Sequence, residues 1–243
     1  MGKNSLLMTA DSFAAVAAIP CLKEAAYVMK IHLNSTLVMI GDSITDCSRA
    51  RPVAESVGWD LGNGYVSLIH AIIGAVCPAQ NIRIRNLGVS GNTVRDLAAR
   101  WQSDVLDLKP DWLSIMIGIN DVWRQFDAPL QTEWHVTLDE YASTLEKLVC
   151  HTRPQLKGLV LMTPYFIEPN RAERMRAMMD QYGKFVLQLA KQYDAIAVDT
   201  QAAFDAVLIK LHPVALASDR IHPTPTGHMI LARAFLNALD FAW

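Results

Sequence analysis

The sequence predicts an α/β protein, a three-layer α/β/α sandwich built on a parallel sheet of five strands. Short apolar runs of strand length alternate along the chain with longer stretches of helical periodicity. Such alternation favours right-handed crossovers between parallel strands, with helices covering both faces of the sheet. The length of 243 residues, 51% of them hydrophobic, suits one large domain with a sizeable core.

Five apolar runs predict the strands. The first begins at Leu37 and stops at Gly41, and the second, residues 82–87, alternates isoleucine and arginine before a glycine turn. The other three are residues 112–117, 159–162 and 195–198. Each run is short and is closed by glycine or by a polar residue, as expected of a strand.

Apolar residues at helical spacing predict the helices that connect these strands. They cover residues 65–76, 94–106, 138–149, 172–193, 201–211 and 226–239. Thr93 is the expected N-terminal cap of the second helix. Residues 49–64 and the polar stretch after Asp121 are predicted as loops.

The charge balance gives no reason to expect a strongly anionic partner. Lys and Arg number 22 against 24 Asp and Glu, a net charge of −2. Nucleic acid and anionic membranes are therefore not expected as partners, and a small or neutral molecule is favoured.

The four cysteines are far apart, without a CxxC pair. This pattern favours free thiols in a reducing compartment, so a cytoplasmic location is expected. Secretion stays open as an alternative because Lys3 precedes an apolar stretch, although Asp11 interrupts it.

Ser43 is the candidate nucleophile. It follows Gly41 by two residues, where a buried strand meets solvent, and Asp42 and Asp46 flank it. A serine hydroxyl is a weak nucleophile unless a base takes its proton and preset donors receive the charge on the substrate oxygen. Gly88 and Asn120 each follow another predicted strand, and ligands of such sheets bind at the carboxyl ends of the strands. The three residues are therefore expected to converge.

His222 is the candidate base. Asp219 precedes it by three residues in the loop before the last predicted helix. This spacing lets a carboxylate hold one imidazole nitrogen while the other nitrogen faces the serine. Asp199 also follows a strand and is a rival acid, but it has no histidine close in sequence. His228, inside the last helix, lacks such an arrangement.

Four motifs carry a resemblance to a known family. GDSIT follows the first strand, NLGVSGNT the second and GIND the third, and DRIHP lies near the carboxyl terminus. In order and spacing they resemble the SGNH, or GDSL-type, esterases, over nearly all of residues 29–243. The resemblance implies a flavodoxin-like sandwich. Ser43 is not in a G-x-S-x-G elbow, so the α/β-hydrolase pattern does not apply.

The resemblance also implies roles for the candidate residues. Ser43, Asp219 and His222 would be the catalytic triad, and Ser43, Gly88 and Asn120 would form the oxyanion hole. Such a mechanism needs no cofactor. No metal site is expected either, because no cluster of histidine and aspartate has ligand spacing.

Within that family, the runs CSRARP, SGNTVRDL, IMIGINDVWRQ and GHMILARAF resemble bacterial acetyl-xylooligosaccharide, or acetylxylan, esterases. The implied function is removal of acetyl groups from acetylated xylo-oligosaccharides or another small acetyl ester. Met29 resembles the natural start of such an enzyme, so residues 1–28 would be an N-terminal extension and 29–243 the hydrolase domain. Ser218 is a departure, because an aromatic residue is expected there.

Aromatic faces and planar hydrogen-bonding groups commonly hold sugars. Four residues in predicted loops are the candidates: Trp59, Trp123, Arg124 and Tyr165. Lids or subunit contacts are the alternative role for these tryptophans. A homo-oligomer is expected, because the family often assembles and because Phe241 and Trp243 leave two aromatics near the end of the chain.

Two other functions stay open at this point. The chain could be a general short-chain esterase, a thioesterase or a lysophospholipase of the same fold. It could also be a carbohydrate-binding protein without turnover, although the complete set of Ser43, Asp219 and His222 argues against this reading.

Overall fold

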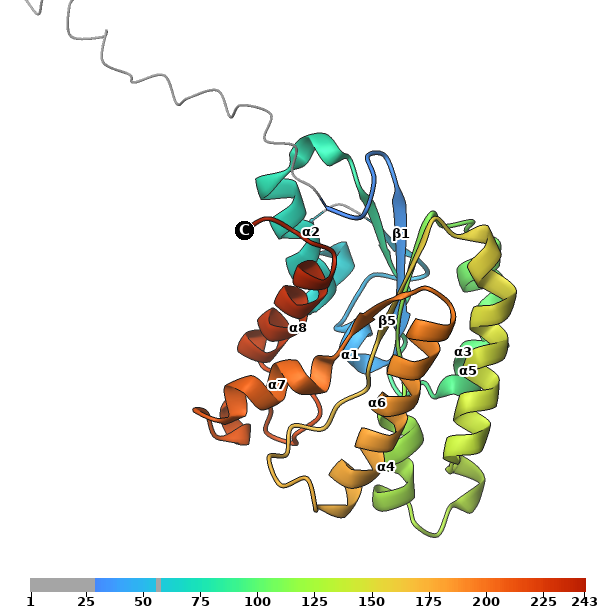
Figure 1. The fold of residues 1–243 in the computed structure, drawn as a ribbon, viewed down its shortest axis with the longest axis vertical. Coiled ribbons are helices and arrows are strands. Elements are labelled where there is room, and N and C mark those ends of the chain that lie inside the picture. The colour runs from blue at the N-terminus through green and yellow to red at the C-terminus, as the bar shows by residue number, and fades with distance from the viewer. Residues whose placement is uncertain (1–28, 56–57) are drawn as a thin grey trace, which may run out of the picture.

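One six-stranded sheet lies between two layers of helices in the computed structural model, which describes residues 29–55 and 58–243 (Figure 1). The strand order is β2-β3-β1-β4-β5-β6. The strands are β1 (Thr36–Gly41), β2 (Ala54–Glu55), β3 (Arg83–Asn86), β4 (Trp112–Met116), β5 (Gly158–Met162) and β6 (Ile196–Val198). The predicted α/β/α sandwich is confirmed.

The predicted number of five strands is wrong by one. Strands β1, β3, β4, β5 and β6 are the five predicted strands, and they are parallel. The sixth, β2, lies in the predicted loop 49–64 and pairs antiparallel with β3 at the edge of the sheet. Its two residues are too few to show a period in the sequence. The Arg85 guanidinium, 3.2 Å from the Glu55 carboxylate, adds an ion pair to this edge.

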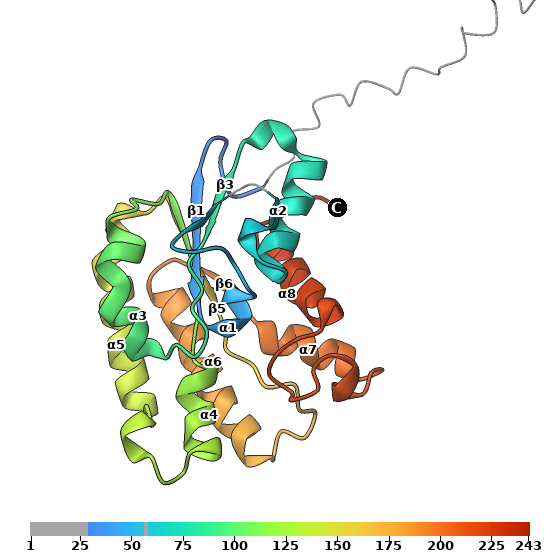
Figure 2. The same cartoon turned by 180° about the vertical axis from the view of Figure 1, so that it is seen from behind.

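The helices follow the predicted alternation. They are α1 (Ser43–Asp46), α2 (Tyr65–Val76), α3 (Val94–Trp101), α4 (Ile119–Asp127), α5 (Leu138–Thr152), α6 (Arg174–Gln192), α7 (Thr200–Leu208) and α8 (Pro225–Ala238). Helices α2, α7 and α8 cover one face of the sheet, and α3, α5 and α6 cover the other (Figure 2). Right-handed crossovers from a central β1 in both directions give this division.

Helix α4 is the main difference from the predicted elements, because the stretch after Asp121 was expected to be a loop. Its buried residues, Ile119 to Val122, all lie in the first turn. The pattern therefore never repeats along the helix, and a period cannot be recognised in the sequence. The consequence is functional, since Asn120, Trp123 and Arg124 lie on a helix and not on a loop.

The predicted helix 94–106 begins as expected and changes character. Thr93 is its cap, with its amide 2.8 Å from Asp96 Oδ2 in a capping box. The α-helix ends at Trp101, and Gln102–Leu106 continue as a π-helix.

The described chain begins and ends against helix α8. The Lys30 amide donates to the Leu239 carbonyl at 2.9 Å, and the Lys30 ammonium lies 3.1 Å from Asp240. Among the described helices, none combines the length and the apolar composition needed to cross a membrane. The expectations for residues 1–28 concern a segment outside the described residues.

Candidate active site

Ser43, His222 and Asp219 form a continuous hydrogen-bonded chain. Ser43 Oγ lies 2.9 Å from His222 Nε2, and His222 Nδ1 lies 2.6 Å from Asp219 Oδ2. Ser43 is the first residue of α1, directly beyond β1, and Asp42 caps that helix by accepting from the Ile44 amide. The structure thus brings together three residues that 179 positions separate in the chain.

The loop before α8 fixes the orientation of the imidazole. Asp219 Oδ1 accepts from the amides of Ile221 and His222 at 2.9 and 2.8 Å. Burial by itself raises the pKa of Asp219, but the hydrogen bonds from the His222 ring and from these amides outweigh burial and lower that pKa. Since a carboxylate only accepts hydrogen bonds, His222 Nδ1 carries the proton and Nε2 can accept from Ser43.

Asn120 also reaches the site, from the first turn of α4. Its side chain is buried, and Nδ2 donates to the Asn92 carbonyl at 2.9 Å. An amide nitrogen carries two protons, so one remains for a second acceptor. Asn120 lines the same cavity as Ser43 and His222, as the sequence predicts.

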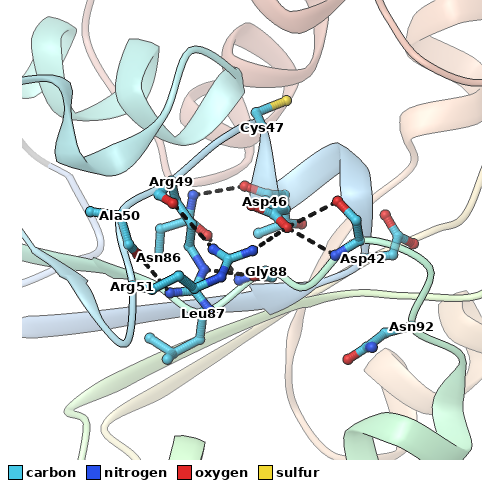
Figure 3. Close-up of polar contacts among 12 residues, drawn as sticks. Asp42, Asp46, Cys47, Arg49, Ala50, Arg51, Asn86, Leu87, Gly88 and Asn92 are labelled. Atoms are coloured by element: carbon cyan, nitrogen blue, oxygen red, sulfur yellow. Dashed lines mark hydrogen bonds and ion pairs between the residues drawn. The ribbon is translucent and has the colours of Figure 1, made fainter.

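The prediction that Gly88 belongs to the oxyanion hole is wrong. The Gly88 amide donates to Asn86 Oδ1 at 2.9 Å, and the Gly88 carbonyl accepts from Arg49 Nε at 2.6 Å (Figure 3). A Cβ at this position would lie 2.2 Å from the Asp46 amide nitrogen. Gly88 is therefore needed for close packing of its loop against α1, and its amide is already bound within the protein.

Gly91, three residues later in the same motif, lies where Gly88 was expected. It lines the cavity with Ser43 and Asn120, and its φ of +82° is in the left-handed region that favours glycine. Within the described residues, no hydrogen bond occupies its amide. The Ser43 amide, at the first position of α1, has no acceptor inside the helix. Two backbone donors therefore face the cavity together with Asn120.

Asp46 holds the glycine loop in place. Its Oδ2 accepts from Arg51 at 2.6 Å and from the amide and hydroxyl of Ser90, each at 2.9 Å. Asn86 Nδ2 adds bonds to the carbonyls of Thr45 and Leu61. Figure 3 shows how Asp46, Arg51 and Asn86 gather between α1 and this loop. The network ties the loop that carries Gly91 to the helix that carries Ser43.

Two of the four predicted substrate-binding residues line the cavity, which has a volume of about 570 Å³. Trp123 packs edge-on against His222 with ring centroids 6.0 Å apart, and the Arg124 guanidinium lies 4.7 Å from the centre of the Trp123 ring. The cavity thus has an aromatic wall and a cationic donor beside the reactive groups.

The other two predictions fail for opposite reasons. Trp59 is 91% exposed and does not line the cavity as described. Tyr165 is fully buried, and its hydroxyl donates to the Ile221 carbonyl at 3.1 Å. Tyr165 therefore supports the loop of His222 from below and cannot touch a substrate.

Cys47 and His228 line the cavity without having been predicted to do so. Cys47 Sγ lies 3.2 Å from His228 Nε2, and His228 Nδ1 accepts from the Tyr65 amide. Burial, with a smaller effect of His222, lowers the pKa of His228 to about 4, and burial raises the pKa of Cys47 to about 12. Both groups are therefore neutral near pH 7. Cys47 has no histidine near it in the sequence and His228 has no acid near it, so no local signal marks the pair.

Two carboxyl groups are fully buried behind the site. Burial raises the pKa of Asp42 to about 7, against the opposing hydrogen bond from the Ile44 amide. Burial likewise raises the pKa of Asp121 to about 7, against a hydrogen bond from the Val94 amide. Asp121 Oδ1 takes that bond at 2.9 Å and fastens α4 to the start of α3, while Oδ2 has no partner within the described structure.

The arrangement can perform acyl transfer. A hydroxyl is bonded to an imidazole that a carboxylate orients, and the residues that carry three N–H donors line the same cavity as that hydroxyl. Over the residues that the structure describes, no three His, Cys, Asp or Glu side chains gather as metal ligands.

Comparison with known proteins gives concordant results. Residues 39–230 match the model of the GDSL-like Lipase/Acylhydrolase family. An acetylxylan esterase of Geobacillus stearothermophilus is 57% identical over 215 residues, which are 88% of this chain and 98% of the relative.

Solved structures agree. The crystal structure of Axe2, an acetylxylan esterase from Geobacillus stearothermophilus, superposes with a TM-score of 0.88 at 57% identity over 88% of this chain and 98% of that one. LAE5, an alpha/beta hydrolase enzyme from the metagenome of Lake Arreo, gives 0.85 at 52% identity over 87% and 97%. Structures of catalytic mutants of Axe2 replace a serine, an aspartate or a histidine by alanine.

Proposed function

Because this chain belongs to the GDSL-like lipase/acylhydrolase family and is a carboxylic ester hydrolase, we propose that it removes acetyl groups from acetylated xylo-oligosaccharides. The observation that carries the proposal is the hydrogen-bonded chain from Ser43 through His222 to Asp219 at the wall of a solvent-accessible cavity. The catalytic serine, aspartate and histidine of Axe2 support it, because their separations along that chain equal those of these three residues.

In the first half-reaction Ser43 Oγ attacks the acetyl carbonyl carbon while His222 Nε2 takes the hydroxyl proton. Asp219 stabilises the imidazolium that forms. The amides of Ser43 and Gly91 and the side chain of Asn120 donate to the oxyanion of the tetrahedral intermediate. His222 then gives its proton to the departing sugar oxygen, and an acetyl-serine remains.

In the second half-reaction water replaces the sugar. His222 takes a proton from the water as it attacks the acetyl carbon, and the same donors stabilise the second oxyanion. Return of the proton to Ser43 Oγ releases acetate and restores the enzyme. No step needs a further group, since the described residues supply every proton transfer.

The sugar specificity is supported by the cavity wall as well as by the relatives. Trp123 offers an aromatic surface and Arg124 a planar donor beside His222, a combination suited to a neutral polyhydroxylated ring. The relative at 57% identity carries the name acetylxylan esterase.

The test is an acetate-release assay on acetylated xylo-oligosaccharides, with p-nitrophenyl acetate and p-nitrophenyl octanoate for comparison. We expect release from the acetylated sugars, little hydrolysis of the octanoyl ester, and loss of about 10⁶-fold in kcat for Ser43→Ala. Hydrolysis of long-chain esters without release from the sugars would favour a general esterase, thioesterase or lysophospholipase. An unchanged rate in Ser43→Ala would show that Ser43 is not the nucleophile, and no release of p-nitrophenol from p-nitrophenyl acetate by the parent chain would favour a binding protein.

We also propose that the chain forms a homo-oligomer. Trp243 is 60% exposed and lies edge-on to Phe241 with ring centroids 5.4 Å apart. Phe241 itself is buried, so one exposed aromatic remains at the end of the chain where two were expected. Sedimentation of the intact chain and of a chain lacking Trp243 tests this, and two identical monomers would contradict it.

A cytoplasmic location remains a proposal as well. It is supported by the free thiols of Cys47, Cys77 and Cys150 in the described part of the chain. Immunodetection in cell fractions tests it, and recovery from the medium alone would contradict it. That nucleic acids and membranes are not partners stays a prediction.

A further inference from the structure

A second cavity continues the cavity of Ser43. It has a volume of about 270 Å³ and shares two lining residues, Gly91 and Arg124, with the first. The two therefore form one groove that passes over the glycine loop and the side of helix α4. Trp134, at the far wall, belongs to the second cavity only.

The backbone on either side of Trp134 is anchored. One guanidinium, that of Arg95, donates to the carbonyls of Glu133 and His135, the two neighbours of Trp134, at 2.7 and 2.9 Å. The same group makes a bidentate pair with Glu140 at 2.5 and 2.7 Å. Trp134 is nevertheless 53% exposed. An aromatic side chain on a fixed backbone, open to the groove, costs little entropy when a ligand covers it.

The cavity at Trp134 is lined by two carboxylates, Asp96 and Glu133, and by two guanidiniums, those of Arg95 and Arg124. Both guanidiniums are paired with acids outside the cavity lining, Glu140 and Asp127, whereas the two carboxylates keep capacity to accept. Asp96 Oδ2 receives the amide and the hydroxyl of Thr93, whereas Asp96 Oδ1 and the Glu133 carboxylate accept no hydrogen bond from the described residues. Arg124 adds a guanidinium at the junction of the two cavities. An anionic ligand would meet two unpaired carboxylates and two guanidiniums that already have carboxylate partners, so anions are disfavoured, and a purely apolar ligand would leave the carboxylates without donors. A neutral ring with several hydroxyl groups satisfies both the aromatic face and the acceptors.

We propose that the cavity at Trp134 is a second sugar subsite, which holds the xylosyl unit next to the acetylated unit, with Trp134 stacked on its ring and Asp96 and Glu133 accepting from its hydroxyl groups. The proposal rests on the proposed function and adds to it a structural basis for preferring oligosaccharides to single sugars. Trp134 acts on specificity and takes no part in the chemistry at Ser43.

The chain offers a matched control in Trp59. Trp59 and Trp134 are both exposed, but among the described residues Trp59 lines neither of the two cavities. The experiment measures kcat/KM for acetate release from acetylated xylose and from acetylated xylotriose, and takes the ratio of the two values. We expect a higher value for the trisaccharide in the parent chain, a ratio reduced about tenfold in Trp134→Ala, and a ratio largely kept in Trp134→Phe. Trp59→Ala should keep the parent ratio.

Binding without turnover gives a second readout. Calorimetric titration of Ser43→Ala with unacetylated xylotriose is expected to show a Kd about tenfold weaker once Trp134→Ala is added. The subsite is overturned if Trp134→Ala keeps both the parent ratio and the parent Kd, or if the parent chain shows no preference for the trisaccharide. Failure of the proposed function looks different: p-nitrophenyl acetate would be hydrolysed while neither acetylated sugar released acetate.

Discussion

The cavity at Ser43 and a second cleft between α6 and α7 both lie beyond the carboxyl ends of the strands, and they use polar side chains in opposite ways. The cleft has a volume of about 290 Å³ and is lined by Thr163, Arg176, Asp180 and Asp205, among others. Asp199, the rival acid in the sequence, also lines it. By residue type alone, the cleft has as much potential for chemistry as the cavity.

In the cleft between α6 and α7 the charges are bound to one another. Arg176 is buried and donates to Asp180 at 2.7 Å and to both oxygens of Asp205 at 2.9 and 2.8 Å. Burial alone raises the pKa of Asp205, but its bonds to Arg176 and Gln201 lower it overall. Asp199 caps α7 by accepting from the Ala202 amide at 2.9 Å. These groups stabilise the fold and have little capacity left for a ligand.

In the Ser43 cavity several groups keep capacity for a ligand. The amides of Ser43 and Gly91 and one proton of Asn120 have no acceptor in the described structure, and the three residues line the cavity, where Asp219 orients His222. Buried polar groups are normally paired, and leaving donors without a partner costs free energy. The comparison teaches that a site is recognised by donors and acceptors that the fold leaves free, and not by the density of charged residues.

The largest effect that tests this comparison is expected when Asp219, from the Ser43 cavity, and Asp199, from the cleft, are each replaced by asparagine in separate variants. Asp219→Asn should lower kcat about 10³- to 10⁴-fold, because an amide that donates to His222 Nδ1 favours the tautomer with the proton on Nε2, which cannot accept from Ser43. Asp199→Asn is the matched control and should change kcat less than about twofold, since an asparagine can still cap α7. Steady-state kinetics with p-nitrophenyl acetate checks both, and a loss in Asp199→Asn with kcat kept in Asp219→Asn would mean that Asp199 is the catalytic acid.

In the cleft between α6 and α7 we expect a substitution to lower the free energy of unfolding and to leave kcat nearly unchanged. Arg176→Met removes the buried guanidinium that Asp205 and Asp180 share, and breaking a buried pair from one side costs about 3–5 kcal/mol of folding free energy. Urea denaturation measures this loss, while kcat of the folded fraction should stay within about twofold. A large loss of kcat at unchanged stability would show that the cleft contributes to catalysis.

Replacing Asn120 tests whether a buried side chain with a free N–H donor contributes to catalysis. Asn120→Ala removes one proposed oxyanion donor and should lower kcat about 10²- to 10³-fold with a small change in KM. Asn170→Ala, at an exposed loop position, is the control. An unchanged kcat in Asn120→Ala would remove this side chain from the reaction.

Much of the fold and of the site could be predicted from the sequence, because both leave local signals. Five strands appear as apolar runs, and the acid and base of the site stand three residues apart in one loop. Ser43 and Asn120 each follow a strand end, so a parallel sheet brings them together whatever the connecting loops do.

The remaining features depend on contacts that only the folded chain makes. Gly88 and Gly91 stand in one motif, and their roles differ because the side chain of Asn86 binds the first amide. Likewise, Tyr165 follows a strand end as a substrate-binding residue would, yet it packs inward under the loop of His222. Cys47 and His228 meet only because α8 packs against α2, which itself contacts α1.

The smallest effect concerns Asp121, the buried carboxyl group that fastens α4 to α3. Its pKa is raised from 3.8 to about 7, so between about pH 4 and pH 7 the folded protein keeps a proton that the unfolded chain has lost. The stabilisation is fully present below pH 4 and is lost as the pH rises through 7. Asp121→Asn has no such proton, and its amide oxygen can still accept from Val94.

The free energy of unfolding should therefore fall less between pH 4.5 and pH 7.5 in Asp121→Asn than in the parent chain, by about 3 kcal/mol. Urea denaturation at the two pH values measures the difference, with the exposed Asp194→Asn as control. Equal pH slopes in Asp121→Asn and the parent would show that Asp121 is ionised in the folded protein. The first turn of α4 would then hold a buried charge without an ion-pair partner, directly beside the proposed oxyanion donor Asn120. The Ser43 cavity would then differ even more from the cleft between α6 and α7, where the buried charges are paired.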